Sequence, residues 1–207
     1  MKTVFLSLGN PYNNYYEVFA KGLVEWFAKE GFALKSVGYN VGAHQGPMTK
    51  IIEVFQESHG AVIVAFKRIE ISKGTEKETE NVDGASLATP WNHIEAAMAF
   101  DCGLPILMIV EKGLRRDGMF EYGPNWYIYE TEMKPEMLDN NKFRLLFAEW
   151  REAVARPRKS LVNLNPAELT LGRLLSSLRV GHVCAIVGGV AALLFIAFEW
   201  GMHVAGK

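Results

Sequence analysis

Residues 61–66 read Ala-Val-Ile-Val-Ala-Phe, and residues 104–110 read Leu-Pro-Ile-Leu-Met-Ile-Val. A short run that is apolar throughout is typical of a strand buried on both faces, as the central strands of a parallel sheet are. Such a sheet needs helices over both of its faces. These two stretches therefore predict an α/β fold.

Strand and helix patterns alternate through residues 1–155. The first helix, for example, has an apolar face formed by Phe19, Leu23 and Trp26, and Gly31 follows its end. The same reasoning predicts strands at 3–8, 33–37, 61–66, 105–110 and 125–129, and helices at 15–30, 48–58, 92–102 and 141–155. We expect a flavodoxin-like three-layer sandwich whose parallel sheet has the strand order 2-1-3-4-5.

In that strand order, ligands bind beyond the carboxyl ends of the strands, where the direction of winding reverses. Residues 7–12 follow the first strand, Lys67 and Arg68 follow the third, and Glu95 lies just before the fourth. We expect these segments to converge on one site. Its predicted substrate-binding residues are Ser7, Gly9, Asn10, Tyr12, Arg68 and Trp91.

Two of these segments suit a phosphate. A turn at Gly9 and Asn10 lets backbone amides approach an anion, and Arg68 with Lys67 can pair with a pyrophosphate. Each also has a simpler interpretation. Gly9 and Asn10 can form an ordinary strand-to-helix turn, and Lys67 and Arg68 can be the solvated end of a strand.

Glu95 is the predicted catalytic residue. It shares one face of the predicted helix with Trp91, four positions earlier. A carboxylate there can stabilise a positive charge that develops on a sugar ring, or attack the anomeric carbon. The alternative is a capping box, because Asn92 and Glu95 have the spacing of a cap and its third helical residue. His93 is either an acid–base group or simply exposed.

The pattern Thr89-x-Trp91-x-x-x-Glu95 resembles the segment that carries the catalytic glutamate of TIR domains that cleave NAD. Glu95 to Ala99, followed by Gly103 to Ile106, is also similar to nucleoside 2-deoxyribosyltransferases. The resemblance covers roughly residues 1–155, which it implies are a TIR-like nucleotide-binding domain. Both families break a bond between ribose C1 and a nitrogen base.

The resemblance to TIR domains implies an NAD+ glycohydrolase for which NAD+ is the substrate and not a cofactor. It also implies self-association into a homo-oligomer and a role in immune or cell-death signalling. The resemblance to deoxyribosyltransferases implies a nucleoside or nucleotide as substrate instead. A non-enzymatic module that binds a nucleotide signal or another TIR-like domain is the third hypothesis.

Composition argues against several other classes. The net charge of −1 does not favour nucleic acid as a partner. The two cysteines indicate neither a disulfide framework nor a metal site. The first strand is followed by no dinucleotide-binding glycine motif, and the sequence contains no Walker A motif.

Residues 69–88 are polar and charged and lack an apolar period. A segment of this length without structure is unusual inside a compact domain, and it predicts a lid or a disordered loop. The corresponding loop of TIR domains is generally shorter.

Beyond residue 155 we expect a basic linker with a short amphipathic helix at 156–179 and a transmembrane helix at 180–203. Residues 180–198 contain no Asp, Glu, Lys or Arg, and about 19 residues suffice to cross a bilayer core. Basic residues predominate on the N-terminal side of this run, so the N-terminal domain is predicted to be cytoplasmic on a single-pass protein in contact with membrane lipid. The alternative is a buried helix of a soluble oligomer.

Overall fold

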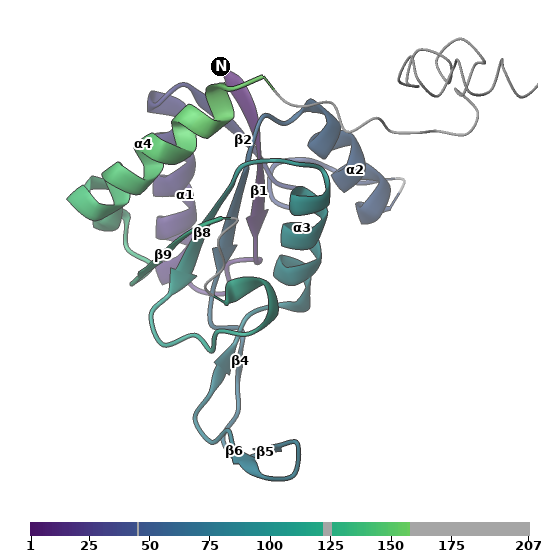
Figure 1. Ribbon diagram of the computed structural model, residues 1–207, viewed down its shortest axis with the longest axis vertical. Helices are drawn as coiled ribbons and strands as arrows, with labels where there is room; N and C mark the ends of the chain where they lie inside the picture. The colour runs from purple at the N-terminus through teal and green to yellow at the C-terminus, as the bar shows by residue number, and fades with distance from the viewer. Residues whose placement is uncertain (45, 122–125, 158–207) are drawn as a thin grey trace, which may run out of the picture. The chain divides into compact units, whose positions relative to one another are not determined.

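The computed structural model describes residues 1–44, 46–121 and 126–157 (Figure 1). Its centre is a five-stranded parallel sheet in the order β2-β1-β3-β8-β9. The strands are β1 (Lys2–Leu8), β2 (Phe32–Lys35), β3 (Ala61–Ala65), β8 (Ile106–Glu111) and β9 (Tyr127–Thr131). The predicted α/β class and strand order are thus confirmed.

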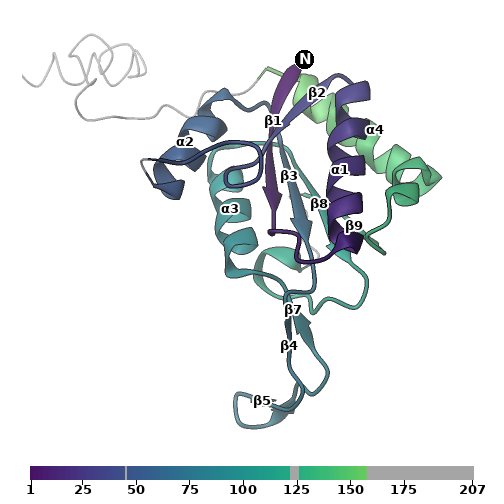
Figure 2. The same cartoon turned by 180° about the vertical axis from the view of Figure 1, so that it is seen from behind.

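Two helices cover each face of the sheet (Figures 1 and 2). Helices α1 (Asn14–Lys29) and α4 (Asn141–Ala155) share one core, and α2 (Pro47–Glu57) and α3 (Pro90–Asp101) share the other. Two short 3-10 helices, η1 (Gly118–Phe120) and η2 (Pro135–Asp139), follow β8 and β9 along the chain.

The apolar run of β3 supplies side chains to both cores. Val62 and Val64 pack with α1 and α4, whereas Ala61, Ile63 and Ala65 pack with α2 and α3. All five are fully buried. Successive side chains of a strand point to opposite faces, so a sheet covered on both sides requires apolar residues at every position.

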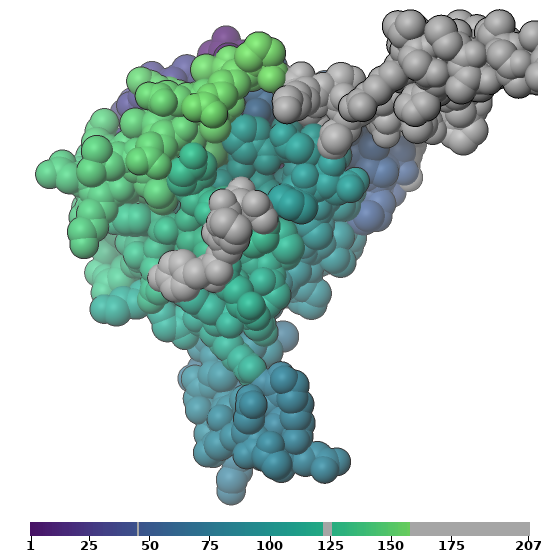
Figure 3. Space-filling view, in the orientation of Figure 1, coloured from purple at the N-terminus to yellow at the C-terminus, as the bar shows by residue number. Residues whose placement is uncertain are grey.

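Of the two alternatives predicted for residues 69–88, the disordered loop was wrong, and the lid stays a prediction. The segment forms an antiparallel arm in which β4 (Ile69–Glu70) pairs with β7 (Ser86–Leu87), and β5 (Thr75–Glu76) with β6 (Glu80–Asn81). The arm projects from the edge of the sheet at which the parallel strands end (Figures 1 and 3). Its tight turn uses Lys77 and Glu78 at positive φ, where glycine or asparagine is usual.

The predicted linker and transmembrane helix lie outside the described residues, apart from residues 156 and 157. Within the described part of the chain, no helix has the length and apolar character needed to cross a membrane.

Candidate active site

A cavity of about 530 Å³ lies beyond the carboxyl ends of the central strands. Four segments of the chain line it: the end of β1, the loop from β2 into α2, the start of the arm, and the first two turns of α3. This is the position that the reversal of strand order predicts for a ligand.

The structure brings most of the predicted site residues together. The cavity is lined by Gly9, Asn10, Arg68, Trp91 and Glu95. Ser7 is fully buried on β1 and contacts the site through the hydrogen bonds described below. Tyr12 is the exception, because it lines a separate cavity of about 450 Å³ that it shares with Tyr16 and Lys67.

Glu95 does not belong to a capping box. Helix α3 begins at Pro90, two residues before the predicted start, and Thr89 is its N-cap. The Thr89 hydroxyl accepts a hydrogen bond of 3.0 Å from the backbone N–H of Trp91. Glu95 therefore lies in the second turn, where it cannot serve as the third residue of the helix and gains little from the helix dipole. The capping role therefore belongs to Thr89, and capping does not account for the glutamate at position 95.

The Glu95 carboxyl has an altered acidity. Burial raises its pKa from 4.5 to about 7, and a hydrogen bond with Ser7 partly opposes that rise. Desolvation disfavours the ionised form, whereas a donor to the carboxylate favours it. A carboxyl group whose pKa lies near neutrality can act as a base, nucleophile or acid under physiological conditions.

Asn92 fixes the orientation of Ser7. Its Nδ2 donates to Ser7 Oγ at 2.8 Å and to the backbone oxygen of Val64 at 3.1 Å. Because the Val64 oxygen can only accept, the amide nitrogen must face it, and Ser7 Oγ then receives the second N–H. The Ser7 proton remains available for Glu95. A relay of donors therefore runs from Asn92 through Ser7 to the Glu95 carboxylate.

Asn92 was missed as a site residue by the sequence reasoning, which gave it only a capping role. It is buried, lines the cavity, and leaves its Oδ1 without a donor among the described residues. The available signal was its spacing of three from Glu95, which places both side chains on one helix face. Val37, Gly38 and Tyr39, which follow β2 and also line the cavity, were missed as well.

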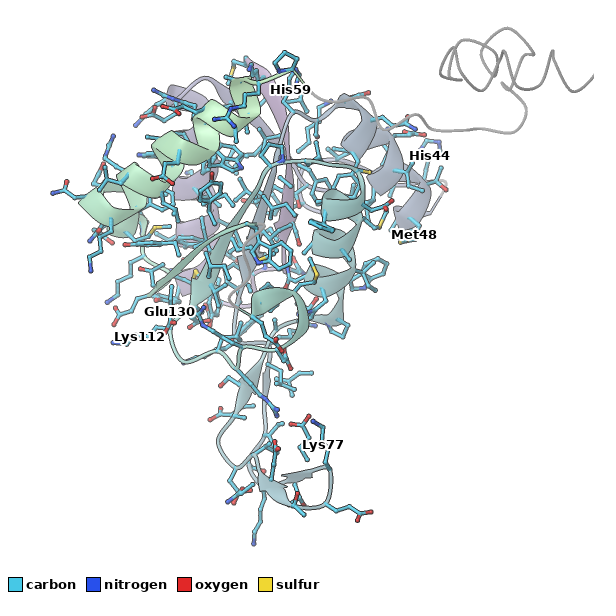
Figure 4. All side chains as sticks on the ribbon, viewed as in Figure 1. His44, Met48, His59, Lys77, Lys112 and Glu130 are labelled. Atoms are coloured by element: carbon cyan, nitrogen blue, oxygen red, sulfur yellow. The ribbon has the colours of Figure 1, made fainter. Side chains whose placement is uncertain are left out.

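The described histidines do not line the cavity. His93 contacts Phe120, with ring centroids 4.5 Å apart, and its Nε2 lies 3.7 Å from Asp117. Figure 4 shows His59 at the edge of the sheet opposite the arm and His44 beside α2. The acid–base role considered for His93 thus has no support in its position.

No family model matches the sequence, and no curated protein matches it. The solved structures that are similar in fold include two that cover about three quarters of this chain. One is the CMP N-glycosidase BcmB of Clostridium botulinum, with a TM-score of 0.39, 13% identity, and coverage of 73% of this chain and 98% of that one. The other is the TIR domains of the activated Roq1 resistosome, with a TM-score of 0.37, 14% identity, and coverage of 74% and 81%. Both scores are low, so the case for a function rests on the cavity and its residues.

Proposed function

We propose that this protein is an NAD+ glycohydrolase in which Glu95 acts on ribose C1 as nicotinamide leaves. The observation that carries the proposal is one carboxylate, Glu95, with a pKa of about 7, in a cavity at the carboxyl edge of the sheet. Among the described residues that line this cavity, Glu95 is the only acidic one.

A single carboxylate suffices for this reaction. Nicotinamide is bound to the ribose as a pyridinium cation, so it departs as a neutral molecule and needs no proton from an acid. The positive charge moves to the sugar, where a carboxylate stabilises it or bonds to C1. Water then adds to C1, and the products are ADP-ribose, nicotinamide and one proton.

The surrounding residues have consistent roles in this proposal. Trp91, which is 45% exposed, offers a ring face to the base. Arg68 lines the cavity and would pair with the phosphates. A ribose hydroxyl that reaches Asn92 would supply the donor that its buried Oδ1 lacks.

A second candidate is an N-glycosidase that acts on a nucleoside or a nucleoside monophosphate. There the base leaves as an anion unless it receives a proton. The observation that favours this candidate is also the pKa of Glu95, because a group with a pKa of about 7 is substantially protonated at neutral pH and can donate. The two candidates therefore use opposite protonation states of the same residue.

The experiment compares NAD+ consumption by the full-length protein, in detergent and in liposomes, for wild type and Glu95→Gln. We expect wild type to release nicotinamide and Glu95→Gln to be slower by about 10²–10⁴-fold. Glu152→Gln, which makes the same chemical change on the exposed surface of α4, is the matched control and should behave as wild type.

The same assay decides between the candidates. CMP and deoxynucleosides are tested in parallel with NAD+. Base release from these compounds, with NAD+ left intact, would replace the leading proposal by the second one. Turnover of neither class by the assembled protein would favour the non-enzymatic binding module.

The finer parts of this proposal concern where the protein acts. We expect it to be tethered to a membrane through residues 180–203, with the N-terminal domain in the cytoplasm, and to self-associate there.

A further inference from the structure

The second cavity adjoins the candidate active site. It has a volume of about 450 Å³, and Arg68 and Ile69 line both cavities. The two hollows therefore lie on either side of one short stretch of chain at the base of the arm. A ligand that extended past Arg68 would occupy both.

The backbone next to Arg68 is held from several sides. The Lys67 N–H donates to the buried carboxylate of Glu111 at 2.8 Å, and the Lys67 oxygen accepts from the Tyr12 hydroxyl at 2.7 Å. The Arg68 N–H donates to the oxygen of Leu87 on β7 at 2.9 Å. Tyr16 donates to Glu111 in turn, at 3.0 Å to one oxygen. This network fixes the ridge between the cavities, so its position does not depend on a ligand.

Arg68 presents a charge that the described part of the protein does not neutralise. Arg115 and Arg116, on the neighbouring loop, form ion pairs with Glu76 and Glu130. Arg68 is exposed and has no ion pair within the described residues. An unpaired guanidinium on a fixed ridge is suited to two adjacent phosphates, which it can contact with parallel N–H groups.

The far wall of the second cavity suits an aromatic base. The ring of Tyr12 is 54% exposed and packs on one side against Tyr16, with ring centroids 4.8 Å apart. Its other side is open for stacking. Glu70 also lines this cavity, and its carboxylate can accept from ribose hydroxyls while disfavouring a phosphate at that end.

We infer that the second cavity binds the second nucleoside of a dinucleotide, whose first half lies against Glu95 and whose pyrophosphate lies on Arg68. The inference rests on the proposed function and deepens it, because it gives the second nucleoside of NAD+ a site that nucleosides and mononucleotides would leave empty. The two halves would bind within a single chain.

Binding is the primary test, because it does not require catalysis. ADP is titrated into the full-length protein, as wild type, Tyr12→Ala and Arg68→Ala. We expect each substitution to weaken binding by about tenfold or more. Tyr15→Ala, in the first turn of α1 and outside both cavities, should leave the affinity unchanged. Tyr12→Phe keeps the ring and loses the hydrogen bonds of the hydroxyl with Lys67 and Tyr16, so it should retain most of the affinity.

Kinetics separate this inference from the proposed function. If NAD+ is cleaved, Tyr12→Ala should raise KM for NAD+ and leave cleavage of nicotinamide mononucleotide unchanged, since that compound lacks the second nucleoside. Cleavage of NAD+ with equal KM in wild type and Tyr12→Ala would overturn the inference and leave the function standing. ADP binding that depends on Tyr12, without any cleavage of NAD+, would support the inference and contradict the proposed activity.

Two further results would overturn the inference. One is ADP affinity that neither Tyr12→Ala nor Arg68→Ala changes. The other is an equal loss of ADP affinity in Tyr12→Phe and Tyr12→Ala, which would mean that the ligand does not recognise the Tyr12 ring. If Tyr12→Ala fails to fold, Arg68→Ala still decides the matter, because the Arg68 side chain is exposed.

Discussion

Glu95 is a residue whose position reduces the stability of the fold. A pKa of about 7 in place of 4.5 means that burial costs the ionised carboxylate about 3 kcal/mol. A glutamate that only capped a helix would be stabilising, and its pKa would not be raised by burial. A group that the protein holds at a cost in stability is characteristic of functional sites.

This cost gives a prediction for Glu95→Gln. Between pH 4.5 and 7 the folded protein keeps a proton on Glu95 that the unfolded chain has released, so folding stability falls as pH rises through this window. Glutamine does not titrate. We expect Glu95→Gln to unfold at a higher temperature than wild type at pH 8, by at most about 3 kcal/mol in stability, and to lose that advantage near pH 4. Thermal unfolding at both pH values checks this, and a pH-independent difference would contradict it.

The pH dependence of catalysis follows from the same group. If the reacting form is the carboxylate, as for NAD+, kcat/KM should rise with pH, with an inflection near 7, and level off above it. If Glu95 must donate a proton, as for a nucleoside, kcat/KM should fall through the same pH range. A rate profile from pH 5 to 9 decides which protonation state acts.

Ser7→Ala should move that inflection. The Ser7 hydrogen bond lowers the pKa of Glu95, so its removal should raise the pKa further and shift the inflection of kcat/KM to higher pH. An inflection that stays in place or moves to lower pH would show that Ser7 does not donate to the carboxylate. Ser7→Ala also removes the oxygen that accepts a hydrogen bond from Asn92. Thermal unfolding of the variant measures how much stability that loss costs.

At the scale of elements, the sequence was sufficient for the sheet and its helices. Uniformly apolar strands and helical periods are strong signals, and all the predicted bounds of the sheet strands and helices lie within two residues of those observed. The start of α3 was ambiguous because Thr89 and Asn92 are both good caps. Pro90 resolves the ambiguity, since proline is favoured at the first helical position.

The arm and the second cavity were beyond such reasoning. The arm has two-residue strands and no apolar alternation, and the turn at its tip is formed by Lys77 and Glu78, so the tip lacks the usual hairpin signals. The cavity that Tyr12 lines depends on where the arm begins. The hydrogen bonds that connect Ser7, Asn92 and Glu95 likewise join residues of β1 and α3, which are far apart in the sequence and meet only in the fold.

The contact between α4 and the start of β3 gives a prediction about packing. A Cβ at Gly60 would lie 2.7 Å from Cγ2 of Val154 and 3.0 Å from the ring of Trp150. We expect Gly60→Ala to lower the stability by about 1–3 kcal/mol, because the buried Trp150 cannot move away without strain. Gly42→Ala, where no atom lies within 4 Å of the added Cβ, is the matched control. Equal stability of the two variants in chemical denaturation would contradict the packing argument.

At the scale of the whole molecule, the proposed membrane tether predicts different behaviour for the full-length chain and for the N-terminal domain alone. We expect the full-length protein to sediment with membranes and to require detergent for extraction, because residues 180–198 carry no charge. A chain that ends at residue 157 should remain in the supernatant. Recovery of both forms in the supernatant would argue for the alternative of a buried helix in a soluble oligomer.

The two cores that share β3 divide the molecule into faces with different tolerances to change. Val62 and Val64 belong to the core beneath α1 and α4, whereas Ile63 belongs to the core beneath α2 and α3, which also line the Glu95 cavity. A substitution at Val62 therefore disturbs the core on the side away from the cavity, and a substitution at Ile63 disturbs the core that includes the cavity walls. In a library of variants, we expect substitutions at Val62 mainly to lower the amount of folded protein. Substitutions at Ile63 should in addition lower the activity of the protein that does fold.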